Sequence, residues 1–585
     1  MDPGTSCDSA GVTMNRRCQA AALFVVLSLA VAGAQSRPTA PVTTERLRQA
    51  PAGEWLTYGL DHAETRFSPL TRITLDNVKQ LERAWSWDIP GGAGQIEATP
   101  LVHDGVLYAS GTWSVVFALD ARTGALKWKW DPAIVRGGRV AGGQTVINGA
   151  PNRGVALYNG KVYAGLQDGR LVALDAATGS VVWVRMTIPY GNSEYVVTGA
   201  PRIVKGKVVI GNGGAEFHGV RGYVTAYDAE TGDQAWRFHI VPGDPSQPFE
   251  SKAMEMAAKT WAGEWWKYGG GGNAWDSFSY DPDANLLYIG TGNGAPWSHH
   301  WRSKGSGDNL FLNSIVAVNA DSGEYVWHYQ TVPGDNWDYT STMTMTLADI
   351  VIDGQPRKVL MQAPKNGFFY VIDRITGRLI SAEKITDHVT WASHVDLKTG
   401  RPVETPIARY DTTGAWISPA QAGAHNWHPM AFSPRTGLVY IPGQNNQSFY
   451  RLASEYVPQL GRTSTGLVRG PGTVPAPPAP QPAGFLVARD PVTQRDRWRI
   501  DLPTFWNGGV LVTASDVLFS GRRSGMLVAH DASTGAVLWE SAIAPAPAAP
   551  ITYELDGRQY VTVLSGAPEG TQGIAGRVQT FVLGR

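Results

Sequence analysis

The sequence predicts an all-β fold, an eight-bladed β-propeller, on three observations. The first is a repeat in which an alternating apolar strand leads, in most copies, into an Asp-x-x-Thr-Gly turn, and a second strand closes on tryptophan. Clear copies end at Trp128, Trp183, Trp236, Trp327 and Trp539. The second is spacing, because 55 and 53 residues separate the first three tryptophans, which suits a four-stranded sheet per repeat. The third is the lack of the long 3.6-residue periodicity that helical repeats need.

Three weaker copies of the repeat bring the count to eight, which is a common size for a large propeller. Two begin at Val371 and Phe432, and one ends at Trp498. We expect the turn glycine of a repeat to take a positive φ, because glycine adopts it without steric cost. The repeats contain six of the 22 tryptophans. We expect these six to pack between blades, as core residues rather than site residues.

Two segments interrupt the spacing and are expected to form loops outside the blades. Residues 239–272 lie in the long gap between Trp236 and Trp327, and their part 254–268 is predicted to contain a short helix. Residues 471–482 are too rich in proline for a strand interior.

The N-terminal residues 1–34 are typical of a signal peptide. Arg16 and Arg17 precede an apolar run at residues 20–31, and small residues at 32–34 suit cleavage. Met14 is an alternative start. Residues 35–54 are predicted to be a linker, and residues 55–585 a single propeller domain. No later run reaches the roughly 18 apolar residues that a membrane span requires, so no span is expected.

Charge and cysteine content exclude several functions. Lys plus Arg equals Asp plus Glu at 50 each, so there is no basic footprint for nucleic acid, and a small neutral partner is favoured. Both cysteines, Cys7 and Cys18, lie within residues 1–34. The mature chain is therefore expected to lack disulfides, a thiol nucleophile and the Cys-x-x-Cys-His attachment of a c-type haem.

The repeat resembles the tryptophan-docking motif of the pyrroloquinoline quinone (PQQ) dependent alcohol dehydrogenases, the quinoprotein methanol and ethanol dehydrogenase family. The resemblance runs from about residue 55 to the C-terminus. It is carried by WLTYGLDHAETRFSPLTRIT, IEATPLVHDGVLYA, GGAEFHGVRGYVTAYD, LLYIGTGNGAPW, PGDNWDYTS, APKNGFFYVIDR and HNWHPMAFSP. Similar repeats also build noncatalytic propellers, so the alternative function is a protein-binding scaffold.

The resemblance implies a metal site. Glu216, Asn293 and Asp338 match the family's metal-binding glutamate, metal-binding asparagine and catalytic aspartate. Two carboxylates and an amide oxygen suit a hard cation such as Ca²⁺. Lanthanide-using relatives carry a further acid two residues after the catalytic one, where this chain has Thr340, so calcium is favoured.

The resemblance also implies the residues that hold PQQ. Trp275 matches the tryptophan on which the cofactor stacks. The residues that match cofactor-edge contacts are Glu97, Arg153, Thr198, Lys365 and Asn426, and the segment Trp506-Asn507 contributes a contact from one of its two residues.

This chain departs from the family pattern at two places. Ile147-Asn148 stand where many members have adjacent, disulfide-bonded cysteines that cover one cofactor face, and an aliphatic side chain can cover a ring by dispersion. Gly213 stands where relatives often have serine, which removes one donor.

The activity implied is oxidation of an alcohol to an aldehyde or ketone in the periplasm, with a separate soluble cytochrome c as electron acceptor. Asp338 is expected to be the general base, with Lys365 supporting the charge that develops at the cofactor. The simpler interpretation is that Asp338 only forms a turn. The sequence does not name the alcohol.

Overall fold

The computed structural model describes residues 40–89, 95–134, 151–189, 194–458, 463, 465–468, 474–566 and 576–584. Contacts divide the chain into two units, Met1–Ala40 and Pro41–Arg585. Only Ala40 of the first unit is described, so the account below concerns the second. The predicted signal peptide and the pair Ile147-Asn148 lie outside the described residues.

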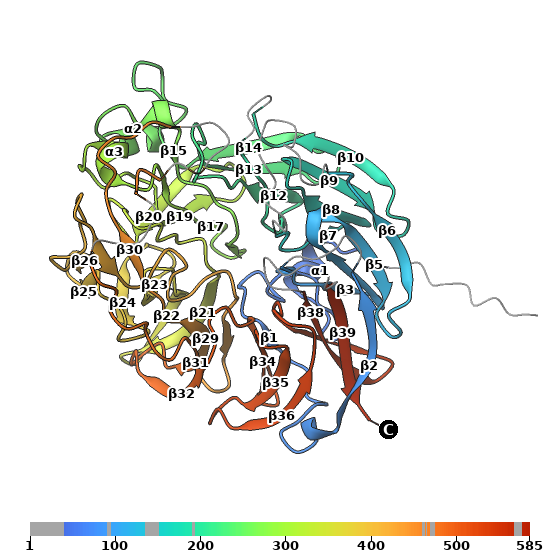
Figure 1. The fold of residues 1–585 in the computed structure, drawn as a ribbon. Helices are drawn as coiled ribbons and strands as arrows, with labels where there is room; N and C mark the ends of the chain where they lie inside the picture. The colour runs from blue at the N-terminus through green and yellow to red at the C-terminus, as the bar shows by residue number, and fades with distance from the viewer. Residues whose placement is uncertain are drawn as a thin grey trace, which may run out of the picture. The chain divides into compact units, whose positions relative to one another are not determined.

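Within the described residues, eight sheets surround a common centre, as a propeller requires (Figure 1). Seven of them have four antiparallel strands, and the remaining one has a fifth, parallel strand at its inner edge. The predicted fold class is therefore confirmed. The first four blades are β3 (Leu101–His103), β4 (Val106–Ser110), β5 (Val116–Asp120) and β6 (Leu126–Trp130); β7 (Ala156–Tyr158), β8 (Lys161–Gly165), β9 (Arg170–Asp175) and β10 (Val181–Met186); β11 (Arg202–Val204), β12 (Lys207–Gly211), β13 (Tyr223–Asp228) and β14 (Gln234–His239); β16 (Phe278–Asp281), β17 (Leu286–Gly290), β19 (Ser314–Asn319) and β20 (Tyr325–Gln330).

The remaining four blades follow the same order except that the last two each include a strand from the start of the chain, β1 in one and β2 in the other. They are β21 (Met345–Ile352), β22 (Gln355–Gln362), β23 (Phe368–Asp373) and β24 (Leu379–Lys384); β28 (Ala431–Ser433), β29 (Leu438–Gln444), β31 (Gly484–Arg489) and β32 (Asp496–Leu502); β33 (Val510–Thr513), β34 (Val517–Arg522), β35 (Met526–Asp531) and β36 (Val537–Ala542), with β1 (Phe67–Ser68) parallel to β33; β37 (Ile551–Leu555), β38 (Arg558–Ser565), β39 (Arg577–Leu583) and β2 (Leu81–Asp88).

The eighth blade closes the ring with both ends of the propeller domain. β2 pairs antiparallel with β39, from Leu81 opposite Leu583 to Asp88 opposite Arg577, and the two strands lie side by side in Figure 1.

This closing blade explains an error in the assignment of repeats. The weak copies at Phe432 and Trp498 lie in one blade, on β28–β29 and β31–β32. Eight was the correct number of blades, but the closing blade carries no copy because its strands are not contiguous in sequence.

Tryptophans on the outer strands dock on the next blade, as predicted. The turn glycines Gly124, Gly179, Gly232, Gly323, Gly377 and Gly535 all have φ between 72° and 79°. A Cβ on Gly179 would lie 2.6 Å from the Trp128 ring, and the Trp128 indole Nε1 donates to Ala176 O at 2.9 Å. We call this arrangement the docking girdle; its tryptophan and glycine pairs are Trp85/Gly124, Trp128/Gly179, Trp183/Gly232, Trp236/Gly323, Trp327/Gly377 and Trp498/Gly535.

The predicted insertions are confirmed where they are described. Residues 239–272 contain α2 (Lys252–Ala258) and the short 3-10 turn η3 (Trp265–Tyr268), while residues 474–482 contain no strand. The other small elements are α1 (Thr44–Arg48), α3 (His299–Ser303), η1 (Val78–Gln80), η2 (Thr112–Ser114), β15 (Gly270–Gly271), β18 (Gly294–Ala295), β25 (Ala392–Asp396), β26 (Arg401–Glu404), β27 (Ala415–Ile417) and β30 (Ser448–Tyr450). None of the helices in the described part of the chain is long and apolar enough to cross a membrane.

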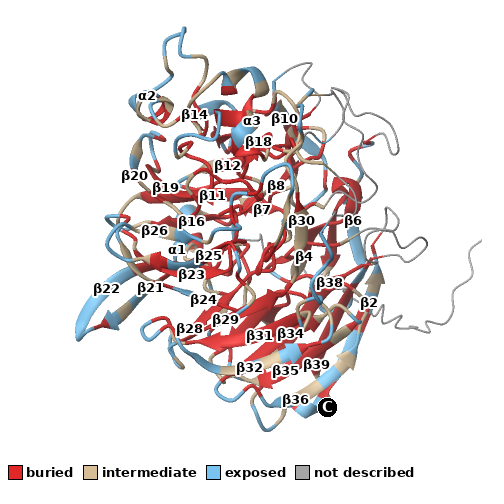
Figure 2. Cartoon of the chain, turned by 60° about the vertical axis from the view of Figure 1, so that its left-hand side comes forward, coloured by how far each residue is buried: buried red, intermediate tan, exposed pale blue. Residues whose placement is uncertain are grey.

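Burial divides the blades into inner and outer parts (Figure 2). Inner strands such as β12 and β17 are almost wholly buried, whereas the outer strands β32 and β36 alternate between exposed and covered residues. Strands with one solvent face show this alternation because successive side chains point to opposite sides. The polar groups of a site must therefore come from the loops at the strand ends.

Candidate active site

The predicted site residues lie on two kinds of connection at one end of the propeller. Glu97, Arg153, Thr198, Trp275, Asp338, Asn426, Trp506 and Asn507 precede the inner strand of a blade, whereas Glu216, Asn293 and Lys365 lie between the second and third strands. In a four-stranded antiparallel blade these two connections emerge at the same end, because each strand reverses direction. The docking-girdle hairpins emerge at the other end. Topology thus brings together residues that are far apart in sequence.

Asp338 lies on the loop between β20 and β21 and is 5% exposed, with φ +67°. Its Oδ2 accepts a hydrogen bond from Lys365 Nζ at 3.0 Å. Burial raises the pKa of Asp338 well above its ordinary value; Lys365 opposes the shift, and the nearby Glu216 adds to it. A non-glycine residue in this backbone region stores strain, which is frequent at functional sites.

Asp335, on the same loop, has the role that the simpler interpretation gave to Asp338. It is fully buried, and its Oδ1 accepts the backbone N–H groups of Trp337 at 3.2 Å and Tyr339 at 3.1 Å. Those bonds form the turn. The Asp338 carboxylate is therefore left to face Lys365.

Glu216, Asn293 and Asp338 form one cluster. The amide of Asn293 lies 3.1 Å from Asp338 Oδ1 and 3.0 Å from Trp297 Nε1, and it satisfies both when its nitrogen faces the carboxylate. Burial raises the pKa of Glu216, while Lys365 and Asn293 oppose the shift. The Glu216 carboxyl group disfavours the charge of the buried Asp338 carboxyl group. Two such carboxyl groups beside an amide oxygen are a donor set that a hard cation would satisfy. Among the described residues, no group of three acidic, His or Cys side chains forms a metal site by itself.

The residues on either side of Asp338 belong to a buried aromatic cluster. Trp337 and Tyr339 stack with centroids 5.3 Å apart, and Trp391 packs against both at 5.0 and 5.4 Å. Arg302 holds the backbone of the loop that carries Asp338. It is 1% exposed and donates a hydrogen bond to Asp335 O at 2.6 Å. Sequence reasoning missed Arg302, because no repeat or motif marks it.

A second cluster gathers four of the residues expected to hold the cofactor. Arg153 donates to Thr198 Oγ1 at 2.8 Å and pairs with Glu97 Oε2 at 2.6 Å. Its Cζ lies 4.5 Å above the Trp275 ring. A flat tricarboxylate that stacked on this face of Trp275 would push the Arg153 guanidinium aside. The guanidinium would then lie at the edge of the tricarboxylate, where the carboxylates need a cation. The cluster therefore fits PQQ.

Asp276 belongs to this cluster and was not predicted. It is 1% exposed, and its Oδ1 lies 4.0 Å from Arg153 Nε. Burial raises its pKa to about 6, with Arg153 and Arg202 opposing the shift. Its position directly after the predicted stacking residue Trp275 was the only signal in the sequence.

The third group, Asn426, Trp506 and Asn507, is engaged mainly with its own loops. Asn426 Nδ2 donates to Ala422 O at 2.7 Å, and Asn507 Nδ2 donates to Thr504 O at 2.6 Å. Trp506 is partly exposed, and its ring meets His428 edge-on with centroids 5.1 Å apart. Of the pair Trp506-Asn507, the tryptophan is thus the freer to contact a ligand.

The departure at Gly213 has a steric basis. Gly213 N donates to Val196 O at 2.7 Å, and a Cβ on Gly213 would lie 2.9 Å from Val196 Cγ2. A serine at this position would require Val196 to move. The absence of a serine hydroxyl at position 213 therefore agrees with the close packing of Val196 against this glycine.

The comparisons with known proteins agree with this geometry. Residues 55–385 and 479–561 match the family model described as glucose/ethanol/alcohol dehydrogenase, beta-propeller domain, which is named PQQ. The quinohemoprotein alcohol dehydrogenase ADH IIB of Pseudomonas putida is 51% identical over 523 residues, which cover 89% of this chain and 74% of the relative. The 1-butanol dehydrogenase (cytochrome c) of Thauera butanivorans is 46% identical over 565 residues, covering 92% and 79%.

Among solved structures, the quinohemoprotein alcohol dehydrogenase of Comamonas testosteroni superposes with a TM-score of 0.85 at 48% identity, covering 92% of this chain and 82% of the other. The fold and these comparisons thus define a propeller oxidoreductase of a class that uses a quinone cofactor. The chain belongs to the PQQ-dependent alcohol dehydrogenase family.

Proposed function

We propose that this chain oxidises alcohols to aldehydes or ketones in the periplasm, with PQQ and Ca²⁺, and passes the electrons to a cytochrome c. The observation that carries the proposal is the buried contact of Asp338 with Lys365, 3.0 Å apart, next to Glu216 and Asn293. A scaffold propeller would gain nothing from burying these charges at its centre, since each buried charge costs free energy.

Asp338 would accept the hydroxyl proton of the alcohol. Its Oδ2 is held by Lys365 and its Oδ1 faces Asn293, so the carboxylate has a fixed orientation before substrate binds. Trp337 and Tyr339 would exclude water from the alcohol carbon, which strengthens every electrostatic contact there.

Calcium would be held by Glu216, Asp338 and Asn293, whose amide must turn its oxygen toward the carboxylates to become a ligand. PQQ would lie on Trp275, with its carboxylates near Arg153. Bound together, the two would supply the electron-accepting group and the charge that polarises it. Lys365 would place a second positive charge beside that group.

The proposed acceptor and compartment rest on a relative and on the sequence. The Thauera relative is named for cytochrome c. Export rests on the signal-peptide pattern of residues 1–34.

Reconstitution tests the proposal. Cofactor-free protein should reduce an artificial dye with ethanol or 1-butanol only after PQQ and Ca²⁺ are both added, because each supplies part of the reacting group. Thr340 leaves the site without a further acid, so La³⁺ should support no more turnover than Ca²⁺. Activity with a nicotinamide cofactor alone, or with La³⁺ alone, would contradict the proposal.

A further inference from the structure

A row of buried polar side chains runs from the cofactor cluster into the centre of the propeller. We call it the axial polar row and define it as Asp276, Tyr58, Arg202 and Glu64. All four are at most 7% exposed. Asp276 lies two residues before β16, and Arg202 begins β11, so the row starts at the site end of the inner strands.

Neighbouring members of the row interact with one another. Arg202 and Asp276 interact electrostatically, and Asp276 also raises the pKa of the Tyr58 phenol, after the larger effect of burial. The Arg202 guanidinium lies 4.2 Å over the Tyr58 ring, and Arg202 Nε donates to Glu64 Oε1 at 2.8 Å. Arg153, above the row, joins it to the cofactor cluster.

Several proton-carrying atoms of the row have no hydrogen-bond partner among the described residues, although Asp276 lies in the electrostatic reach of Arg153 and Arg202. These are both oxygens of Asp276, the hydroxyl of Tyr58 and Oε2 of Glu64. A buried polar atom without a hydrogen bond costs about 1–3 kcal/mol, so these four atoms call for water or another exchangeable hydrogen-bond partner.

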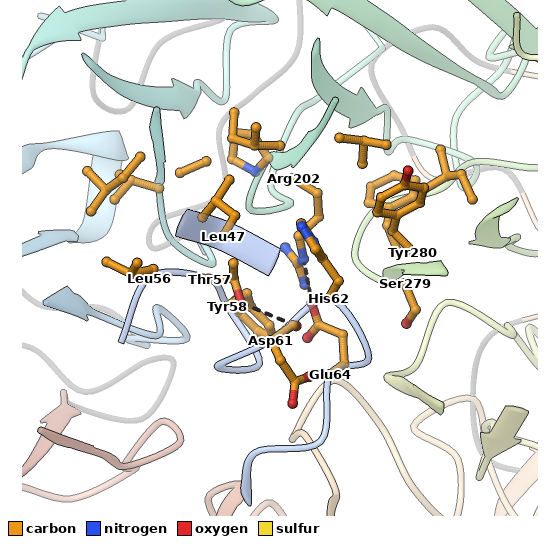
Figure 3. A pocket seen from close by; sticks show the side chains of 18 residues that line it. Leu47, Leu56, Thr57, Tyr58, Asp61, His62, Glu64, Arg202, Ser279 and Tyr280 are labelled. Carbon is orange, nitrogen blue, oxygen red and sulfur yellow. Dashed lines mark hydrogen bonds and ion pairs between the residues drawn. The ribbon is translucent and has the colours of Figure 1, made fainter. Parts of the chain in front are cut away.

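A small cavity adjoins the lower end of the row (Figure 3). Its volume is about 20 Å³, which is room for one ordered water. Tyr58, Glu64 and Arg202 line one part of it. Asp61 and His62, both partly exposed, line another part of it.

We propose that the axial polar row and the water-sized cavity below it conduct protons from the cofactor cluster to solvent. This inference rests on the proposed function. Oxidation of one alcohol molecule to the carbonyl releases two electrons and two protons. The electrons leave to two one-electron acceptors, and the two protons must reach bulk water. The row provides carboxyl and hydroxyl groups that can take up and release a proton along this route.

The proton affinities of the row suit this role near neutral pH. Burial raises the pKa of Glu64 to about 7 and that of Asp276 to about 6. The charged groups that face Glu64 are Arg202 and Arg66, which favour its ionised form, and Asp61, which disfavours it. A relay group works best when its pKa lies near the working pH.

The test compares proton release with electron transfer. Reconstituted enzyme would be mixed rapidly with alcohol and ferricyanide, which takes up electrons without protons, in weak buffer with a pH indicator. Glu64→Gln keeps shape but cannot ionise, and Tyr58→Phe keeps the ring under Arg202 but loses the hydroxyl. Each should slow proton appearance about tenfold, less than the 10²- to 10⁴-fold loss of a direct acid–base catalyst, because water can partly replace a relay group.

Asp281→Asn is the matched control, because it breaks another buried pair, Arg374 Nε to Asp281 Oδ2 at 2.7 Å, outside the row. It should leave proton release unchanged. Equal proton-release rates in wild type, Glu64→Gln and Tyr58→Phe would overturn the proposal, as would equal slowing by Asp281→Asn. A wild type without alcohol-dependent electron transfer would instead reject the proposed function, and with it the need for a relay.

A second readout needs no cofactor or turnover. Infrared difference spectra of PQQ-free protein between pH 5 and 9 should show a carboxyl band that titrates near the value of about 7 given above for Glu64. The band should vanish in Glu64→Gln and persist in Asp281→Asn. A wild type without such a band would overturn the relay even if the enzyme is active.

Discussion

The docking girdle and the axial loops use the same residue types for opposite purposes. In the girdle, Asp175 Oδ1 accepts the backbone N–H groups of Ala177 and Thr178, and Trp128 rests on Gly179. At the axis, Asp338 instead faces Lys365. The girdle satisfies its polar groups locally, whereas the axis gathers charged groups from many blades. Hydrogen bonds made within a blade stabilise the fold, whereas charged side chains brought together from several blades can take part in a reaction.

The largest expected effect is on turnover at the axis. Asp338→Asn keeps the size of the side chain but removes the proton acceptor, so turnover should fall by roughly 10²- to 10⁴-fold. Asp335→Asn retains an acceptor oxygen for the two backbone N–H groups, so its turnover should stay near wild type. Steady-state kinetics, with thermal unfolding to confirm folding, measures both. Normal turnover in Asp338→Asn would show that this carboxylate is structural.

The girdle should respond in stability rather than activity. Trp183 is 8% exposed and docks on Gly232, so Trp183→Ala should lower the free energy of unfolding by about 3–5 kcal/mol. Val184 on the same strand is 38% exposed, and Val184→Ala should change it by no more than about 0.5 kcal/mol. Urea unfolding measures the difference. Turnover per folded molecule should stay within about twofold of wild type, since no girdle residue contacts the reacting atoms.

The smallest effect expected is the pH dependence of the free energy of unfolding that comes from His530, which contacts the girdle glycine Gly535. Burial lowers the pKa of His530 to about 4, and the ring is held by Ser520 and Gly535 O. The unfolded chain takes up this proton near pH 6.5 and the folded chain only near 4, so acidification across that window destabilises the fold by up to about 3 kcal/mol. His530→Gln should reduce that loss. Urea midpoints at pH 7 and pH 4.5 measure it, and identical losses in both proteins would contradict this assignment.

The outer architecture was predictable because its contacts recur. The spacing of Trp128, Trp183 and Trp236 reflects one docking contact made again in each blade, and the period predicts the sheets. No copy of the repeat was recognised in the closing blade. The docking tryptophan of that blade, Trp85, comes from the start of the chain and is not preceded by the Asp-x-x-Thr-Gly turn of a repeat.

The axial residues have no such period. Glu216, Asn293 and Asp338 were found only because each matched a family motif, and the structure brings them together. Asp276 and Arg302 were missed because burial of a polar side chain depends on what other blades place against it. Neither composition nor alternation carries that information, so only the three-dimensional arrangement reveals it.

The shared last blade also limits when the ring can close. Arg577 Nε bonds Asp88 Oδ1 at 2.8 Å, although the two residues are 489 positions apart. Strand β2 is among the first parts of the propeller to be synthesised, yet its partner β39 is among the last. Contacts of such long sequence separation form slowly, because the loop-closure entropy must be met first. Earlier blades can therefore form in succession, but the ring stays open and its edge strands stay available for aggregation until the final strand is released.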